Sequence, residues 1–154
     1  MSAKSYSSRD VELMRMAIDA AKQCTNVETA YNVGAVICSS DKTRVLSTGY
    51  SRQYPGNTHA EECALMSLPK NISLKDAVMY TTMEPCSQRL SGKLPCVARI
   101  LESGRIAKVF VGVREPPNFV LQCTGMEELA KRGVHVVHVD ELETECRLLN
   151  KHLN

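Results

Sequence analysis

The sequence predicts an α/β fold, a three-layer α/β/α sandwich around a central mixed five-stranded sheet. Short β-type runs alternate with helical segments along the 154 residues, and the later strands are separated by helices. A strand–helix–strand unit places its strands parallel. An earlier pair of strands, joined by a short polar turn, is typical of an antiparallel hairpin. The two patterns together predict a sheet of mixed direction.

The first half of the chain supplies a helix, the hairpin and a second helix. From Ser8 onward, apolar residues recur at helical spacing, and Ser8 is a suitable N-cap. Two β-type runs, residues 33–38 and 44–49, flank turn residues and predict the hairpin. A second helix is expected to begin near His59 and to end before Pro69.

The second half supplies the remaining strands. Residues 77–81 and 108–113 are rich in β-branched or aromatic side chains and should form central strands. Pro95 suits the first turn of a helix over 95–102, where its missing N–H costs nothing. Further expected elements are a helix over 125–131, a strand over 134–139 and a terminal helix over 140–153 capped by Asp140.

Length and composition indicate one domain, residues 1–154, with the first seven residues and the tail mobile. A 17.0 kDa chain can bury a core without disulfides. Seven cysteines, an odd number without a secretory signal, indicate a reducing compartment and a cytoplasmic protein, the nucleus being equally compatible. No apolar run approaches the ~18 residues of a membrane span. A net charge of +2 and 5% aromatic residues give no indication of nucleic-acid binding.

Two segments carry the chemistry of a metal site, THAEECAL at 58–65 and MEPCSQRLSGKLPC at 83–96. His59, Cys86 and Cys96 offer imidazole and thiolate groups, the ligands that zinc prefers. A catalytic zinc keeps three protein ligands and one open position for water. These three residues match that number and predict a catalytic zinc ion.

Glu61, two residues after His59, is placed to move protons without binding the metal. Zinc lowers the pKa of its bound water to about 7, and the resulting hydroxide attacks a ring carbon that bears an amino group. Glu61 carries the proton to the departing nitrogen, so that ammonia leaves. The sequence thus predicts a hydrolytic deaminase.

The chain resembles the cytidine-deaminase-like superfamily, and within it the pyrimidine deaminases of riboflavin biosynthesis. Zinc deaminases share an H-x-E and P-C-x-x-C signature. Here nine residues separate Cys86 from Cys96, and this wider spacing is a mark of the riboflavin branch. The segments that carry the resemblance are NVGAVI (32–37), HAEECAL (59–65), EPCSQRLSGKLPC (84–96) and EPPNFVLQCTGMEELAKRGVHV (115–136).

The resemblance implies a phosphorylated small-molecule substrate, a 2,5-diamino-6-(ribityl or ribosyl)amino-4(3H)-pyrimidinone 5′-phosphate. At the matching positions, Asn32 would contact the pyrimidine and Lys93 the phosphate. A Lys charge beside the permissive backbone of Gly92 suits a phosphate. The resemblance also implies a homodimer and a deaminase without the reductase domain to which bacterial relatives are fused. Relatives often carry a His two residues after the first cysteine, whereas this chain has Gln88 at that position.

Other interpretations remain open at this point. The chain could be a CMP- or tRNA-type deaminase, although those enzymes use the short cysteine spacing. It could also be a zinc-binding partner subunit without turnover, or Cys63 could complete a structural site as a fourth ligand. Glu62 is expected at the surface, and nothing in the sequence fixes the direction of Arg52 or Arg89. The other four cysteines are expected to be core or incidental thiols: Cys24, Cys38, Cys123 and Cys146.

Overall fold

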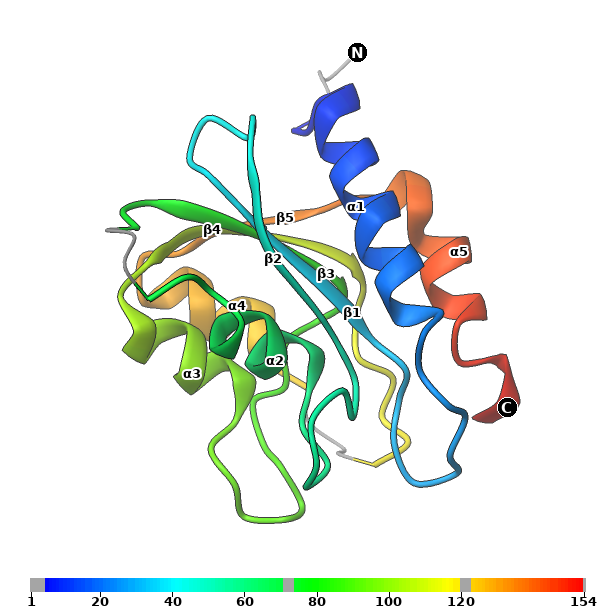
Figure 1. Cartoon of the computed structure of the whole chain (residues 1–154). Helices are drawn as coiled ribbons and strands as arrows, with labels where there is room; N and C mark the ends of the chain where they lie inside the picture. Colours follow the sequence, from blue (N-terminus) through cyan, green and yellow to red (C-terminus); the bar gives the residue numbers. More distant parts are fainter. Residues whose placement is uncertain (1–4, 71–73, 120–122, 154) are drawn as a thin grey trace.

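The computed structural model describes residues 5–70, 74–119 and 123–153, and a five-stranded mixed sheet of order β2-β1-β3-β4-β5 runs through it (Figure 1). The early strands form the predicted antiparallel hairpin, and the later ones are joined by helices and run parallel. The predicted sheet is therefore confirmed. The strands are β1 (Gly34–Cys38), β2 (Val45–Tyr50), β3 (Ala77–Met83), β4 (Ile106–Val113) and β5 (His135–His138).

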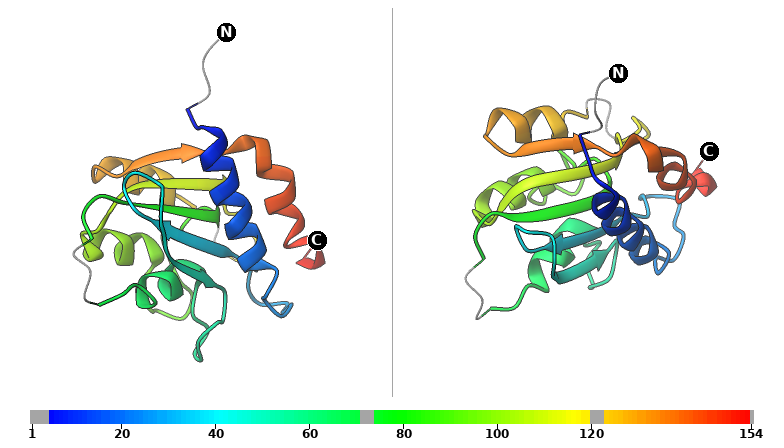
Figure 2. Two further views of the ribbon diagram at one scale, coloured as in Figure 1. Left: turned by 45° about the horizontal axis from the view of Figure 1, so that its top comes forward. Right: turned by 90° about the horizontal axis from the view of Figure 1, so that it is seen from above.

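Helices cover both faces of the sheet, which confirms the three-layer sandwich (Figures 1 and 2). Alternate residues of a strand point to opposite faces. In β1, Val36 therefore packs in the core under α1 and α5, and Ile37 packs in the core under the other three helices. The helices are α1 (Ser8–Ala21), α2 (Ala60–Met66), α3 (Cys96–Ser103), α4 (Gly125–Lys131) and α5 (Glu143–Leu148).

The N-cap of α1 is Ser7, so the expectation for Ser8 was wrong by one residue. Asp10 decides the position because it completes a capping box: its backbone N–H donates to Ser7 Oγ at 3.3 Å, and its Oδ2 accepts from Ser7 N at 2.8 Å. The expected mobility of residues 1–7 falls partly on residues 1–4, which lie outside the described part. Within that part, Tyr6 donates a hydrogen bond to Asp140 Oδ1 at 2.7 Å.

The single terminal helix expected over 140–153 is broken into three pieces. A 3-10 turn at Asp140–Leu142 leads into the short α5, and a second 3-10 turn follows at Lys151–Leu153. The Asp140 side chain does not cap a helix, because its carboxylate accepts from Tyr6 instead. Asn150 lies between α5 and the second turn, and its side chain bonds the distant backbone of Asn32, accepting from N at 2.6 Å and donating to O at 3.0 Å.

Two loops and one helix start converge at one end of the sheet. The chain enters α2 directly after His59, and β3 leaves the sheet at Met83, shortly before the segment that joins it to α3. The loop after β4 reaches the same region through hydrogen bonds described below. In the described part of the chain, no helix has the length and apolar character that a membrane span requires.

Candidate active site

His59, Cys86 and Cys96 come together as a three-ligand cluster. Their ligand atoms all lie within 4.8 Å of one another. His59 Nδ1 is 3.5 Å from Cys86 Sγ and 3.4 Å from Cys96 Sγ. Ligands at the usual zinc–sulfur and zinc–nitrogen distances in a tetrahedron would be separated by about 3.6 Å. The donor set and its spacing therefore fit a zinc ion with three protein ligands.

The local sequence places two of these ligands at helix starts, and Cys86 lies in the segment between β3 and α3. His59 is the N-cap of α2, and Pro95 is the N-cap of α3, so that the helix begins at Cys96, one residue later than expected. Cys86 Sγ accepts the backbone N–H of Cys96 at 3.2 Å. This contact, the thiol of Cys96 and the neighbouring His59 lower the pKa of Cys86, against the opposing effect of burial. A thiolate, the form that binds a metal, is thereby favoured.

Glu61 projects from the first turn of α2 beside this cluster. The residue is 4% exposed, and burial, reinforced by the charge of Cys86, raises the pKa of its carboxyl to about 7. A carboxyl group with this pKa can both accept and release a proton near neutral pH. The position and the electrostatics suit the proton carrier that the sequence predicted.

Glu62 is buried, so the expectation of a surface position was wrong. Its Oε1 lies 3.1 Å from Arg89 Nη1 and its Oε2 lies 3.2 Å from Arg99 Nη2. The Arg89 side chain is 2% exposed. Burial alone would raise the pKa of Glu62, but the His59 N–H and the two guanidinium groups hold it below its ordinary value. Two arginines that are distant in sequence offset the cost of burying the Glu62 carboxylate. The residues next to Glu62 in the sequence gave no indication of these partners.

Glu84 is a third buried carboxylate at this site, and the sequence analysis did not single it out. Its Oε1 accepts from the backbone N–H of Glu115 at 3.0 Å, and its Oε2 accepts from that of Met126 at 3.0 Å. The residue therefore ties the end of β3 to the loop after β4 and to the start of α4. Its place in the EPC segment was visible in the sequence, but its partners were not.

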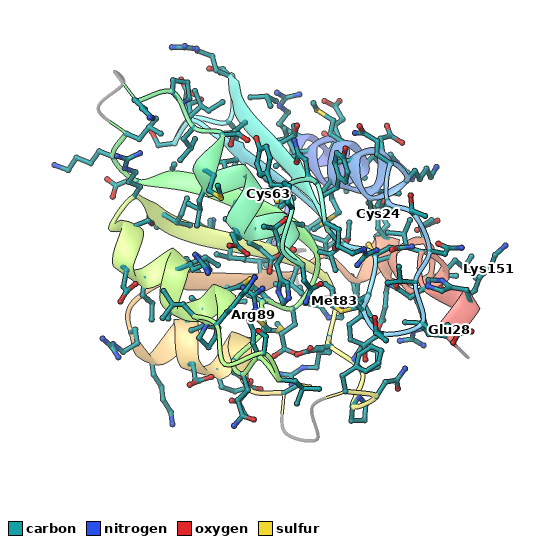
Figure 3. The ribbon with its side chains drawn as sticks, turned by 60° about the horizontal axis from the view of Figure 1, so that its bottom comes forward. Cys24, Glu28, Cys63, Met83, Arg89 and Lys151 are labelled. Atoms are coloured by element: carbon teal, nitrogen blue, oxygen red, sulfur yellow. The ribbon has the colours of Figure 1, made fainter. Side chains whose placement is uncertain are left out.

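A cavity of about 120 Å³ opens beside the cluster. Its wall includes His59, Glu61 and Cys86. Figure 3 looks onto this end of the molecule and labels Met83 and Arg89, two further residues of the wall. A planar ring that enters the cavity would therefore meet both the candidate metal ligands and the Glu61 carboxyl group.

Glu115 and two aromatic residues also line the cavity. Glu115 Oε2 is buried and has no hydrogen-bond partner among the described residues. Burial raises the pKa of this carboxyl to about 7. Tyr31 and Phe119 make an edge-to-face contact, with ring centroids 4.9 Å apart, and Tyr31 donates to Pro116 O at 2.7 Å. The loop after β4 is thus fastened against the segment before β1.

The two residues expected to contact the substrate are not in the cavity wall. Asn32 is 4% exposed, and its side chain bonds Arg52 Nη2 at 2.5 Å and Asn26 Oδ1 at 2.7 Å. Lys93 is exposed, and its ammonium group donates to the carbonyl of Gly56. The sequence missed that Asn32 faces an arginine, because the two residues are brought together only by the fold.

Cys63 lies outside the metal cluster. It is fully buried in α2, its side chain packs near Gly49, and it is not among the described groups close enough to share a metal. A fourth protein ligand from Cys63 is therefore not supported. The other four cysteines take part in no disulfide bond within the described part of the chain, and burial raises the pKa of each of them: Cys24, Cys38, Cys123 and Cys146.

Comparison with known proteins places this geometry in a family. Residues 7–113 match the model of the cytidine and deoxycytidylate deaminase zinc-binding region. A diaminohydroxyphosphoribosylamino-pyrimidine deaminase of Schizosaccharomyces pombe is 44% identical over 138 residues, 88% of this chain and 33% of that protein. A cytosine deaminase of Candida albicans is 33% identical, covering 87% of this chain and 83% of that enzyme.

A solved structure agrees in fold. The Rib2 deaminase of Aspergillus oryzae, crystallised in complex with DARIPP, is 31% identical, with a TM-score of 0.82 over 95% of this chain and 92% of that one. The chain spans about a third of the length of the fission-yeast relative. On the strength of the matched zinc-binding region and the assembled His59, Cys86 and Cys96 cluster, the chain belongs to the cytidine and deoxycytidylate deaminase family, together with the riboflavin-type pyrimidine deaminases.

Proposed function

We propose that this chain catalyses the hydrolytic deamination of a 2,5-diamino-6-(ribityl or ribosyl)amino-4(3H)-pyrimidinone 5′-phosphate. The observation that carries the proposal is the convergence of His59, Cys86 and Cys96 in one cluster, with the buried Glu61 carboxyl beside it at a cavity. This arrangement suits removal of an amino group from a planar ring.

His59 Nδ1, Cys86 Sγ and Cys96 Sγ hold the zinc ion in this proposal. When bound, zinc acts as a Lewis acid that makes water nucleophilic at neutral pH. The Glu61 carboxylate accepts a proton from the attacking water and delivers it to the amino nitrogen, and the second proton of the water passes to the adjacent ring nitrogen, so that ammonia leaves and a ring carbonyl remains. Its raised pKa suits both halves of this transfer.

The choice of substrate class rests on similarity. The fission-yeast relative is named for a diaminohydroxyphosphoribosylamino-pyrimidine, and the Aspergillus structure contains DARIPP. The wide spacing of Cys86 and Cys96 favours the same branch over a CMP or tRNA-base deaminase. A partner subunit without turnover is disfavoured because Glu61 is present and lies beside the cluster.

Three further statements belong to the proposal. Residues 1–154 form a single deaminase domain, the protein is a cytoplasmic enzyme, and it assembles as a homodimer. Exposed apolar side chains support the dimer, because Leu90 in the cavity wall is 80% exposed and Met66 at the end of α2 is 60% exposed. Sedimentation equilibrium of the wild-type protein tests the assembly, and a monomer at micromolar concentration would contradict it.

Ammonia release tests the activity. The zinc-quantified protein is offered the diaminopyrimidinone phosphate in ribityl and ribosyl forms, with CMP, cytidine, cytosine and a tRNA stem-loop as controls. Activity on a diaminopyrimidine supports the proposal, and Glu61→Gln should abolish it while the zinc content stays unchanged. Activity on a control alone, or undiminished turnover by Glu61→Gln, would overturn the proposal.

A further inference from the structure

A phosphorylated substrate requires a cationic partner, and two arginines, Arg52 and Arg89, line the cavity. Arg89 is paired with Glu62, a carboxylate that it shares with Arg99, and its side chain is 2% exposed. Its Nη2 donates to Asn57 O at 2.9 Å. Arg89 therefore serves to hold the loop between the two cysteines and offers little exposed surface to a ligand.

Arg52 has no such compensation. None of the ion pairs within the described residues includes it, and its three hydrogen bonds are to neutral oxygens. Nη1 donates to Tyr31 O at 3.1 Å, and Nη2 donates to Thr25 O at 3.0 Å and to Asn32 Oδ1 at 2.5 Å. A guanidinium carries five N–H donors, so donors remain available for a ligand. A fixed and uncompensated cation in a cavity wall is suited to an anion.

The backbone around Arg52 is also specialised. Arg52 has φ +64°, in the left-handed region that a side chain with a Cβ rarely adopts. Its N–H donates to Thr58 O at 2.6 Å, which fastens this conformation to the residue before His59. The geometry therefore links the position of Arg52 directly to the start of α2 and hence to the metal cluster.

The neighbouring wall adds unused hydrogen-bond donors. Thr29 and Ala30 line the same cavity, and no described residue accepts a hydrogen bond from their backbone N–H groups. Consecutive backbone N–H groups are common partners of phosphate in proteins. Glu28 is the acidic residue on this loop, and Figure 3 shows it well to one side of Met83 and Arg89.

We propose that Arg52 binds the substrate phosphate, aided by the Thr29 and Ala30 N–H groups, with Asn32 as the positioning residue that holds the guanidinium. The inference rests on the proposed function. It assigns Asn32 an indirect role through Arg52 in place of contact with the pyrimidine. It also assigns the main phosphate contact to Arg52 in the cavity wall instead of Lys93, which is exposed and donates to the carbonyl of Gly56.

The test is a binding cycle between Arg52 and the phosphate. All proteins carry Glu61→Gln to prevent turnover, are loaded with zinc and are checked for melting temperature. Calorimetry then gives Kd for the diaminopyrimidinone phosphate and for its dephosphorylated form. The quantity of interest is the ratio of the two Kd values, because it isolates the phosphate. The variants are Arg52→Gln and Lys93→Gln, with the exposed Arg15→Gln as a matched control on α1.

Arg52→Gln should lower the preference for the phosphorylated form by about 10- to 100-fold, the range expected for a charged hydrogen bond. Arg15→Gln should leave the ratio unchanged, and Lys93→Gln should change it less than Arg52→Gln does. An unchanged ratio in Arg52→Gln, or a larger loss in Lys93→Gln, would overturn the inference.

Asn32→Asp supplies an independent measurement that leaves Arg52 intact. A carboxylate at this position holds the guanidinium but cancels its charge, so the preference for the phosphate should fall. The change also removes the donation from Asn32 Nδ2 to Asn26 Oδ1, so the melting temperature is measured to show that the variant is folded. A merely structural role for Asn32 predicts an unchanged ratio in a folded protein, and that result would refute the proposal. Ammonia release by the wild-type protein distinguishes failure of this inference from failure of the proposed function. If the wild type releases ammonia but the ratio of the two Kd values does not depend on Arg52, only this inference is refuted. If the protein neither turns over nor binds the substrate, the proposed function is refuted as well.

Discussion

Glu62→Ala should be among the most destabilising substitutions next to the active site. The Glu62 carboxylate contacts Arg89 at 3.1 Å and Arg99 at 3.2 Å, and it accepts from the backbone N–H of His59 at 3.1 Å. Removal of the carboxylate leaves the Arg89 guanidinium, whose side chain is 2% exposed, without a counter-charge. The loss of stability therefore comes mainly from the Arg89 cation, which is left buried and unpaired, and less from the loss of attraction between Glu62 and Arg89.

The magnitude follows from the exposure of each partner. An unpaired buried charge costs about 3–5 kcal/mol. The lost hydrogen bond to the His59 N–H adds about 1 kcal/mol. The bridge to Arg99, whose side chain is 27% exposed, adds less than about 1 kcal/mol. Since Arg89 regains some water when the loop relaxes, we expect a total loss of about 4 kcal/mol. This is a large part of the roughly 5–15 kcal/mol that stabilises a typical domain.

Urea unfolding of the zinc-loaded protein, followed by circular dichroism, measures this loss. Glu12→Ala is the matched control, because Glu12 pairs with Arg9 at 3.0 Å but is 66% exposed, so it should lose at most about 1 kcal/mol. Chelator competition gives a second readout. Zinc affinity should fall in Glu62→Ala, because Arg89 lies in the loop between the two cysteine ligands.

The sign of the pH dependence provides a further check. The folded-state pKa of Glu62 is lowered, so its stabilising contribution is complete above the ordinary value of 4.5 and is lost as the pH falls through the folded-state pKa. The difference in the free energy of unfolding between wild type and Glu62→Ala should therefore become smaller at acidic pH. A loss within 1 kcal/mol of the Glu12→Ala control at neutral pH would refute the assignment of Glu62 as the counter-charge of Arg89.

Three further changes have directions fixed by the structure. A Cβ on Gly49 would lie 2.4 Å from Ala60 O, so Gly49→Ala must displace α2. The substitution should lower the free energy of unfolding by about 1–3 kcal/mol and reduce zinc retention. A variant with the wild-type melting temperature and one zinc ion per chain would contradict this. Burial raises the pKa of Glu115 from 4.5 to about 7, so the stability associated with its protonated form is lost as the pH rises through that range. Glu115→Gln should consequently raise the melting temperature relative to wild type at pH 8 but not at pH 4, and a pH-independent difference would argue against a buried carboxyl. Tyr80→Phe removes a 2.5 Å hydrogen bond to Asp10 Oδ1 between buried groups and should cost about 1–3 kcal/mol in urea unfolding, whereas an unchanged midpoint would show that Asp10 finds another donor.

The elements and the metal ligands were predictable because their signals are local. β-branched runs and turn residues located all five strands to within about two residues, and helical periodicity located α1, α2, α3 and α4. The type and spacing of His59, Glu61, Cys86 and Cys96 indicated a zinc deaminase, because few other sites need this combination. The same reasoning erred at the chain end, where Tyr6 and Asn150 form hydrogen bonds with residues more than 100 positions away.

The partners of the charged and amide side chains depended on tertiary structure. Glu62 was assigned to the surface because its neighbours in sequence offer no counter-charge, yet Arg89 and Arg99 reach it across the fold. Asn32 was predicted to contact the substrate, and the fold also sets it against Arg52, 20 residues away. The sequence by itself predicted which residues can hold zinc and which can move a proton, because that chemistry resides in side-chain type and short spacing. The tertiary structure decided which charges are buried, neutralised or left free for a ligand, because electrostatic energy depends on the distance in space to every neighbouring group.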